Sequence, residues 1–395
     1  MLAYRLLKGL IKTSKTECKI CGKTSKLTAD CLRICVDCLR ERPKEALPYV
    51  RETHARIRAR FELPPLPPKR KDGVLCNVCA NECRLGEQDT SYCGFKRIID
   101  GRLESLISSE SGVLHSYLDS QVTNCCAAWF CPAGTATGYP TYTYTPGPEY
   151  GYSNLAIFFY GCNFDCLFCQ NASHKNLSAE KRVTAEDLIA TTRRDPRISC
   201  WCFFGGSPEP QLPFAIRASQ AVLKEMSNRI LRICFEWNGC GNPKLVSQAA
   251  DIALQSGGTT KFDLKCFTPS ISHALSGVPN QRAFENFKMI ARDIYPLRPD
   301  LPVLTATTLL VPTYVDAREV EQIAQFIANL DPEIPYSLLV FHPDFMMADL
   351  PITPLKQVIE CYKMAKKHLT KVHIGNLHSL GIRNMKEFKT KIRKE

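Results

Sequence analysis

From residue 154 onward, short apolar runs alternate with longer segments in which apolar residues recur at helical spacing. The short runs are rich in β-branched and aromatic residues and have the length of strands. They are LAIFFY from Leu155, CWCFF from Cys200, ILRICFEW from Ile230, TKFDLKCF from Thr260, VLTATTLLV from Val303, YSLLVF from Tyr336 and KVHIG from Lys371. The helical patterns between them include TAEDLIATTRRD, FAIRASQAVLKEM, QRAFENFKMIARDI, DAREVEQIAQFIANL and PLKQVIECYKMAKKHL. This alternation predicts a parallel α/β architecture, either an open doubly wound sheet or a (β/α) barrel, with ligands at the carboxyl ends of the strands.

The chain before residue 154 has a different pattern. A cysteine-rich module comes first and is followed by EALPYVRETHARIRARF, which is rich in good helix formers. The proline-rich stretch LPPLPPKRKDG cannot continue that helix and predicts a stiff linker. The turn-rich part after it includes TGYPTYTYTPGPEYGY, which we expect to be an ordered loop packed on a neighbour. The predicted parts are residues 1–63, 64–73, 74–153 and 154–395.

The composition of the chain excludes several classes of protein. With 395 residues, 45% of them hydrophobic and 23% charged, the chain can bury a sizeable core, which excludes a disordered or fibrous protein. The N-terminal MLAYRLLKGLIKTSK has only short apolar runs broken by Arg5, Lys8 and Lys12, so we expect no signal peptide, no membrane span and a cytoplasmic location. Residues 1–75 carry 18 Lys or Arg against 8 Asp or Glu, which indicates either a solvated basic face or an acidic partner such as nucleic acid.

The chain contains 21 cysteines, and 12 of them precede residue 132. Disulfides are rare in the reducing cytosol, where clustered thiols more often hold metal. We therefore expect metal sites in the front part of the chain.

The sequence GCNFDCLFCQN directly follows the first apolar run and places Cys162, Cys166 and Cys169 in a C-x-x-x-C-x-x-C pattern. Three thiolates on one tight loop suit a 4Fe-4S cluster that keeps one iron without a protein ligand, whereas a structural zinc ion takes four ligands. The free iron can chelate the amino and carboxylate groups of S-adenosylmethionine. One electron from the reduced cluster can then break the sulfonium bond and release a 5'-deoxyadenosyl radical.

These residues resemble the radical S-adenosylmethionine (radical SAM) superfamily, and more narrowly the pyruvate formate-lyase activating enzymes and their AmmeMemoRadiSam relatives, from about Val74 to the end. The resemblance implies a partial (β/α)6 TIM-like barrel, and the cysteine spacing before it predicts a cysteine-rich, zinc-ribbon-like N-terminal extension. It implies that Cys162, Cys166 and Cys169 are the cluster ligands and that Phe168 packs near the adenine. It also implies an oxidoreductase that takes hydrogen from a substrate, such as a glycyl position in a partner protein, and receives electrons from a flavodoxin- or ferredoxin-like donor.

Two later motifs match the family's cofactor-binding elements in order. FFGGSPEPQ resembles the Gly-Gly-Glu-Pro element, which implies that the backbone at Gly205 and Gly206 binds the methionyl amino group. Ser207 stands where the family usually has an acid, and Glu209 is a candidate to compensate. FEWNGCG resembles the Thr-Asn-Gly element, so that Glu236 and Asn238 would bind the ribose hydroxyls.

Two further elements follow. FDLKCF resembles the family's Asp-x-Lys element, which implies that Asp263 and Lys265 point into the site and that the lysine pairs with the methionyl carboxylate. His342 matches a histidine that approaches the cofactor in the activating enzymes.

Eleven of the remaining cysteines form three groups. Cys18, Cys21, Cys35 and Cys38 make two knuckles with the spacing of a tetrahedral zinc site. A second set of four, Cys76, Cys79, Cys83 and Cys93, fits either zinc or a second iron-sulfur cluster. The third group, Cys125, Cys126 and Cys131, supplies a metal ligand, a radical-quenching thiol, or neither.

Two alternatives to an activating-enzyme-like function stay open. One is a radical SAM methyltransferase that also uses cobalamin. The other, from a different class, is a zinc-ribbon protein that binds nucleic acid or protein and carries a degenerate barrel.

Overall fold

A computed structural model describes residues 14–179 and 181–393. The N-terminal stretch in which we predicted no signal peptide therefore lies mostly outside the described residues. Within the described ranges, no helix has both the length and the apolar character needed to cross a membrane.

The fold is built around a nine-stranded sheet whose largest part is parallel. Each parallel strand pairs with the next parallel strand along the chain, and the order of these strands across the sheet never reverses. The parallel strands are β8 (Ser153–Phe159), β10 (Ile198–Gly205), β11 (Arg232–Trp237), β12 (Thr260–Asp263), β13 (Leu304–Leu310), β14 (Tyr336–Val340) and β15 (Val372–Gly375). Each lies within or overlaps one of the seven apolar runs, so the prediction of a parallel α/β sheet is confirmed. The sheet has one parallel strand more than the six implied by the family resemblance.

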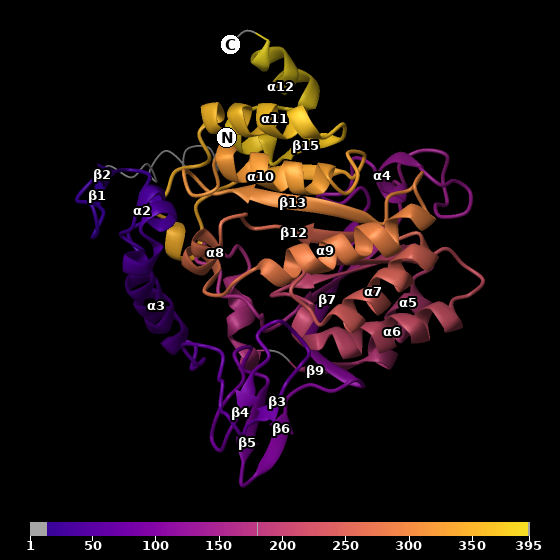
Figure 1. The fold of residues 1–395 in the computed structure, drawn as a ribbon. Helices are drawn as coiled ribbons and strands as arrows, with labels where there is room; N and C mark the ends of the chain where they lie inside the picture. Colours follow the sequence, from indigo (N-terminus) through magenta and orange to yellow (C-terminus); the bar gives the residue numbers. More distant parts are fainter. Residues whose placement is uncertain (1–13, 180, 394–395) are drawn as a thin grey trace.

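Helices connect these strands and cover one face of the sheet. Because a parallel crossover is almost always right-handed and the order never reverses, successive helices fall on the same side. Figure 1 shows this layer in front of the strands. The covering helices are α5 (Ala185–Arg194), α6 (Leu212–Glu225), α7 (Pro243–Ser256), α9 (Gln281–Asp293), α10 (Ala317–Ala328) and α11 (Leu355–His368).

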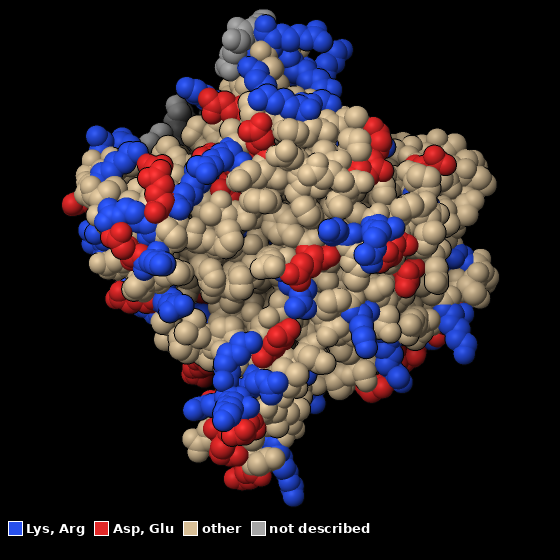
Figure 2. Space-filling view, viewed as in Figure 1, with Lys and Arg blue, Asp and Glu red and all other residues tan. Residues whose placement is uncertain are grey.

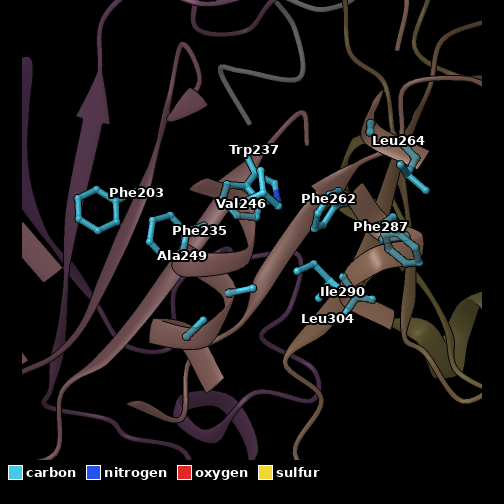
Figure 3. Close-up of a cluster of buried hydrophobic side chains, with 14 of the residues drawn as sticks. Phe203, Phe235, Trp237, Val246, Ala249, Phe262, Leu264, Phe287, Ile290 and Leu304 are labelled. Atoms are coloured by element: carbon cyan, nitrogen blue, oxygen red, sulfur yellow. The ribbon is translucent and has the colours of Figure 1, made fainter. Parts of the chain in front are cut away.

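The main core lies between the sheet and this helical layer. Phe203, Phe235 and Phe262 come from adjacent strands and are fully buried. The rings of Phe203 and Phe235 stack with centroids 5.2 Å apart, and Phe262 meets Phe287 of α9 edge to face at 5.3 Å. Figure 3 shows these rings beside Val246 of α7. Since side chains alternate along a strand, the residues between these aromatic positions face the other side of the sheet, which is the interior of the partial barrel.

Two antiparallel strands extend the sheet beyond β8. β7 (Ser111–Ser120) pairs with β8, and β9 (Arg182–Thr184) pairs with β7. We expected a loop-rich segment here. The second half of β7, from His115 to Ser120, is only half-buried or exposed, so it lacks the apolar run by which the other strands were predicted.

The rest of residues 74–153 is short hairpins and loops. The loop at 137–152 contains no helix or strand, as expected, and it is fixed to the sheet by a buried ion pair between Glu149 and Arg232 of β11. The short elements of this part are β3 (Val74–Leu75), β4 (Arg84–Leu85), β5 (Lys96–Ile99), β6 (Arg102–Ser105) and α4 (Pro132–Thr135).

The N-terminal module lies beside β13 (Figure 1), and the N–H of Asp30 donates to Asp349, in the segment after β14, at 3.0 Å. Arg40 donates two hydrogen bonds to Asp316 at 2.8 and 2.7 Å and one to Glu319 at 3.1 Å, both at the start of α10. The buried Tyr314 hydroxyl donates to the carbonyl of Ile34 at 2.9 Å. The elements of this module are β1 (Thr16–Glu17), β2 (Thr24–Ser25), α2 (Val36–Glu41) and α3 (Pro43–Ala59).

Two helices remain. α8 (Pro269–Ser276) contacts α2 and α3 of the N-terminal module. The last helix, α12 (Met385–Ile392), carries Lys386, Lys389 and Lys391, and Figure 2 shows Lys and Arg side chains gathered there at the top of the molecule.

Candidate active site at the carboxyl edge of the sheet

The three-cysteine loop begins two residues after β8 and opens into a cavity of about 180 Å³. Cys162, Cys166 and Cys169 all line this cavity. Burial raises the pKa of each of these thiols, that of Cys169 to about 11. The parallel strands end at this edge, so residues that follow four different strands meet around the loop.

Gly205, the last residue of β10, and Gly206, directly after it, form one wall of the cavity. Gly205 has a φ of +111°, and a Cβ there would lie 2.7 Å from the backbone of Phe159. A Cβ on Gly206 would lie only 2.1 Å from the carbonyl oxygen of Gly161. Both positions therefore require glycine because the backbone passes directly against β8 and the start of the cysteine loop.

Ser207 lines the cavity, whereas Glu209 does not. The Glu209 carboxyl is fully buried behind Ser207, bonds to its hydroxyl and accepts the N–H of Gly239 at 2.7 Å. Burial raises the pKa of Glu209 to about 7, against the opposing effect of these hydrogen bonds. Glu209 thus reaches the cavity wall only through Ser207, and its predicted compensating role stays a prediction.

Asn238, just after β11, joins three loops at this edge. Its side-chain amide donates to the Asn163 side chain at 2.7 Å and to the Ser207 hydroxyl at 3.0 Å. Asn163 belongs to the cysteine loop, and its carbonyl accepts from Asn81 at 2.7 Å. The loops after β8, β10 and β11 are therefore held in one arrangement by side-chain amides and a hydroxyl.

Asp263, the last residue of β12, and Lys265, two residues later, form an ion pair that lines the cavity. The ammonium of Lys265 lies 5.5 Å from the ring centroid of Phe168. Burial alone would lower the pKa of Lys265, but the charges of Asp263 and of the Cys166 thiol outweigh burial and raise it. The cation therefore lies between the cysteine loop and the end of β12.

Glu236 also lines the cavity, whereas His342 does not. Glu236 faces the barrel interior, and its side chain is 41% exposed to the cavities around it. The side chain of His342 is 40% exposed and has Asp344 as a neighbour at 3.8 Å. The structure therefore brings together every residue predicted for the cofactor except His342, whose role stays a prediction.

A buried charged cluster beneath the cysteine loop was not predicted. Asp165, within the loop, contacts His54 at 2.7 Å, Arg58 at 3.6 Å and the ammonium of Lys175. Burial alone would raise the pKa of Asp165, but these neighbouring positive groups hold it well below its usual range. His54 and Arg58 belong to α3, so the N-terminal module contacts the cysteine loop directly.

The cavity also presents buried polar atoms that lack partners among the described residues: Oδ1 of Asp263, Nδ1 of His174 and Nε1 of Trp237. Burying such atoms is costly unless a hydrogen-bond partner is supplied. Three thiols, a cation, a carboxylate and unpartnered polar groups on one cavity fit a thiolate-bound cluster with a polar, charged cofactor beside it.

The four N-terminal cysteines converge closely. The sulfurs of Cys18 and Cys38 lie 3.8 Å apart, as do those of Cys21 and Cys35. With zinc–sulfur bonds of about 2.3 Å, the edge of a regular tetrahedron of thiolates is about 3.8 Å. The arrangement has the dimensions of a single-ion tetrathiolate site.

Cys76, Cys79, Cys83 and Cys93 lie near one another but less tightly. Burial and, after it, the nearby thiols raise the pKa values of Cys79 and Cys83, the latter to about 11. Among the described residues, no three of these four have ligand atoms that all lie within 4.8 Å of one another. Thiolates that bind separate irons of a cubane stand further apart than those around a single ion.

Residues 156–327 match the sequence model of the Radical SAM superfamily. This span starts within β8, contains the cysteine loop, and extends almost to the end of α10. Residues 156–327 are a radical SAM domain.

Among curated proteins, this chain is similar to the isethionate sulfite-lyase activating enzyme of Desulfovibrio desulfuricans, with 32% identity over 162 residues. The match covers 41% of this chain and 46% of that enzyme, so the chain spans about half the length of this relative.

Two solved structures are also similar. A domain of a pyruvate-formate lyase-activating enzyme from Bacteroides vulgatus has 19% identity and a TM-score of 0.33, and the match covers 44% of this chain and 98% of that one. SuiB of Streptococcus suis bound to precursor peptide SuiA has 13% identity and a TM-score of 0.42, with 56% and 48% coverage.

Proposed function

We propose that the chain reductively cleaves S-adenosylmethionine at a 4Fe-4S cluster held by Cys162, Cys166 and Cys169 and uses the resulting radical to take hydrogen from a substrate. The observation that carries the proposal is the single cavity at the carboxyl edge, which these thiols share with Gly205 and Gly206 and with the charged residues at the ends of β11 and β12. A radical SAM domain supports it.

The cluster, when bound, supplies the electron that breaks the sulfonium bond and yields the 5'-deoxyadenosyl radical. The protein's own groups bind and orient the cofactor. Lys265 would pair with its carboxylate, the backbone at Gly205 and Gly206 would receive its amino group, and Glu236 and Asn238 would bind its ribose. Phe168 would pack against the adenine, and the apolar side chains of Leu309 and Leu339 help exclude water from the cavity.

We further propose that the substrate is a position in a partner protein. The relative from Desulfovibrio desulfuricans is named an activating enzyme for a lyase, which favours a protein rather than a small metabolite. An electron donor of the flavodoxin or ferredoxin type would reduce the cluster.

The proposal is tested by anaerobic incubation of the iron-reconstituted chain with S-adenosylmethionine and a strong reductant, with 5'-deoxyadenosine measured by chromatography. Cys166→Ala is expected to abolish product, while Cys361→Ala, a buried thiol in α11 outside every thiol group described above, serves as the matched control and retains it. Product formation by Cys166→Ala at the wild-type rate would refute the assignment of the cluster loop. Transfer of a methyl group together with a cobalamin spectrum would instead favour the methyltransferase.

A further inference from the structure

A second cavity, of about 270 Å³, lies inside the barrel next to the first. Its lining residues, such as Cys202, Cys234 and Lys261, precede the residues that line the first cavity along the same strands. It therefore lies toward the amino ends of the strands. Barrel interiors are ordinarily filled by apolar side chains, so thiols and charges at these positions call for a chemical explanation.

Three potential metal ligands converge beside this cavity. The sulfurs of Cys125 and Cys126 and a carboxylate oxygen of Glu236 all lie within 4.8 Å of one another. In the described part of the chain, the N-terminal tetrathiolate group is the only other set of three or more His, Cys, Asp or Glu side chains that meets this criterion. Two sulfurs and one carboxylate oxygen are a donor set that suits zinc.

Metal binding through both thiols would leave a charge that the described protein does not balance. Lys261, whose side chain is only 2% exposed, places its ammonium 3.1 Å from Cys125, 3.1 Å from Glu236 and 3.2 Å from Cys202. With both ligand thiols ionised, two thiolates and one carboxylate carry three negative charges, and one ammonium offsets one of them. A divalent cation would neutralise the other two, while the lysine would hold the ligands by hydrogen bonds from outside the metal.

The loop that carries the two cysteines is fixed across the barrel. The carbonyl of Cys126 accepts from the Ser337 hydroxyl of β14 at 2.8 Å and from the indole of Trp129 at 3.1 Å. Trp129 in turn stacks on His373 of β15, with ring centroids 5.2 Å apart and planes 11° from parallel. The ligands thus come from a loop tied to β14 and β15 and from β11, so the site is preorganised by the fold.

We propose that Cys125, Cys126 and Glu236 bind a zinc ion that keeps its fourth position open. A closed structural zinc site uses four protein ligands, whereas three leave one position for an exogenous donor. Glu236 lines the cofactor cavity, the interior cavity and a wide lateral cavity of about 780 Å³ that also touches Cys125 and Cys126. The open position faces the junction of these spaces and would take a thiolate or carboxylate of the substrate. This inference goes beyond the proposed function: it uses one oxygen of the Glu236 carboxylate and leaves the other for the ribose of the cofactor.

The experiment measures zinc in the full chain, reconstituted anaerobically with iron and sulfide, by elemental analysis and by zinc K-edge absorption. Cys126→Ala and Glu236→Gln each remove one ligand, and each variant is expected to contain one equivalent of zinc less than the wild type. Cys131→Ala, which removes a half-buried thiol that lines the same interior cavity but lies outside the ligand set, is expected to lose none. In the wild type, the absorption spectrum is expected to contain an oxygen ligand, because the other predicted zinc sites are all-thiolate.

A wild-type spectrum with sulfur ligands alone would overturn the proposal, as would zinc contents in Cys126→Ala and Glu236→Gln equal to that of the wild type. The wild-type spectrum decides the question even if a variant fails to fold. Neither measurement uses cleavage of S-adenosylmethionine, so failure here is distinguishable from failure of the proposed function.

Discussion

Replacing Glu209 by glutamine tests how the buried carboxyl behind Ser207 contributes to the free energy of unfolding. Glu209 is fully buried, and burial raises its pKa from the ordinary value of 4.5 to about 7. Between these two values, the folded chain keeps a proton that the unfolded chain releases. The contribution of Glu209 to the free energy of unfolding is therefore fully present below pH 4.5 and is lost as the pH rises through 7.

The size of the effect follows from the two pKa values. At about 1.4 kcal/mol for each pH unit, the interval from 4.5 to about 7 corresponds to a loss of about 3 kcal/mol. In Glu209→Gln the side-chain oxygen can still accept from Gly239, and the amide can donate to the Ser207 hydroxyl, but the titration is absent. Relative to wild type, the variant should gain about 3 kcal/mol of stability between pH 4.5 and pH 8.

The assay is urea unfolding of the full chain at a series of pH values, with the free energy of unfolding compared between the two proteins. Glu149→Gln is the matched control. Burial alone would raise the pKa of Glu149, but its ion pair with Arg232 outweighs burial and lowers it, so the advantage of the wild type over this variant should not decline as the pH rises. A difference between wild type and Glu209→Gln that stays constant from pH 4.5 to 8 would refute the reasoning.

Three other changes have defined outcomes. Lys175→Met removes one cation from the buried cluster around Asp165 and is expected to destabilise the chain by about 3–5 kcal/mol. The thermal midpoint should therefore fall, and an unchanged midpoint would show that the Lys175–Asp165 ion pair does not stabilise the fold. Gly206→Ala drives a Cβ into the backbone of the cysteine loop and is expected to abolish binding of S-adenosylmethionine in equilibrium dialysis, whereas Gly147→Ala, with nothing within 4 Å, is not. Cys21→Ala is expected to lose one zinc equivalent and to unfold the N-terminal module, as measured by faster proteolysis there; full zinc retention would contradict the tetrathiolate site.

The strand and helix pattern predicted the main sheet because buried parallel strands are continuous apolar runs. β7 was not predicted because much of its length is half-buried or exposed and it therefore lacks a continuous apolar run. Motif order along the chain predicted which residues follow β8, β10, β11 and β12, and the sheet brings them together because parallel strands end at one edge.

Contacts between segments that are far apart in the sequence could not be predicted from the sequence. The Asp165–His54 pair joins residues 111 positions apart, and nothing in either local sequence marks them as partners. The same holds for Cys125 and Glu236, whose proximity depends on how the loop after β7 crosses the barrel. Asp165 lies within the cysteine pattern, directly before Cys166, and a single aspartate at that position is a weak signal on its own.

The contact between α3 and the cysteine loop has a consequence for the minimal functional unit. A chain shortened to begin at residue 64 would retain the whole radical SAM domain but would lose His54 and Arg58, leaving the Asp165 carboxylate to Lys175 alone. It would also uncover the surface of α8 on which α2 and α3 lie. The barrel alone would therefore lack two of the contacts that hold the three-cysteine loop, and unfolding of the N-terminal module would disturb that loop as well.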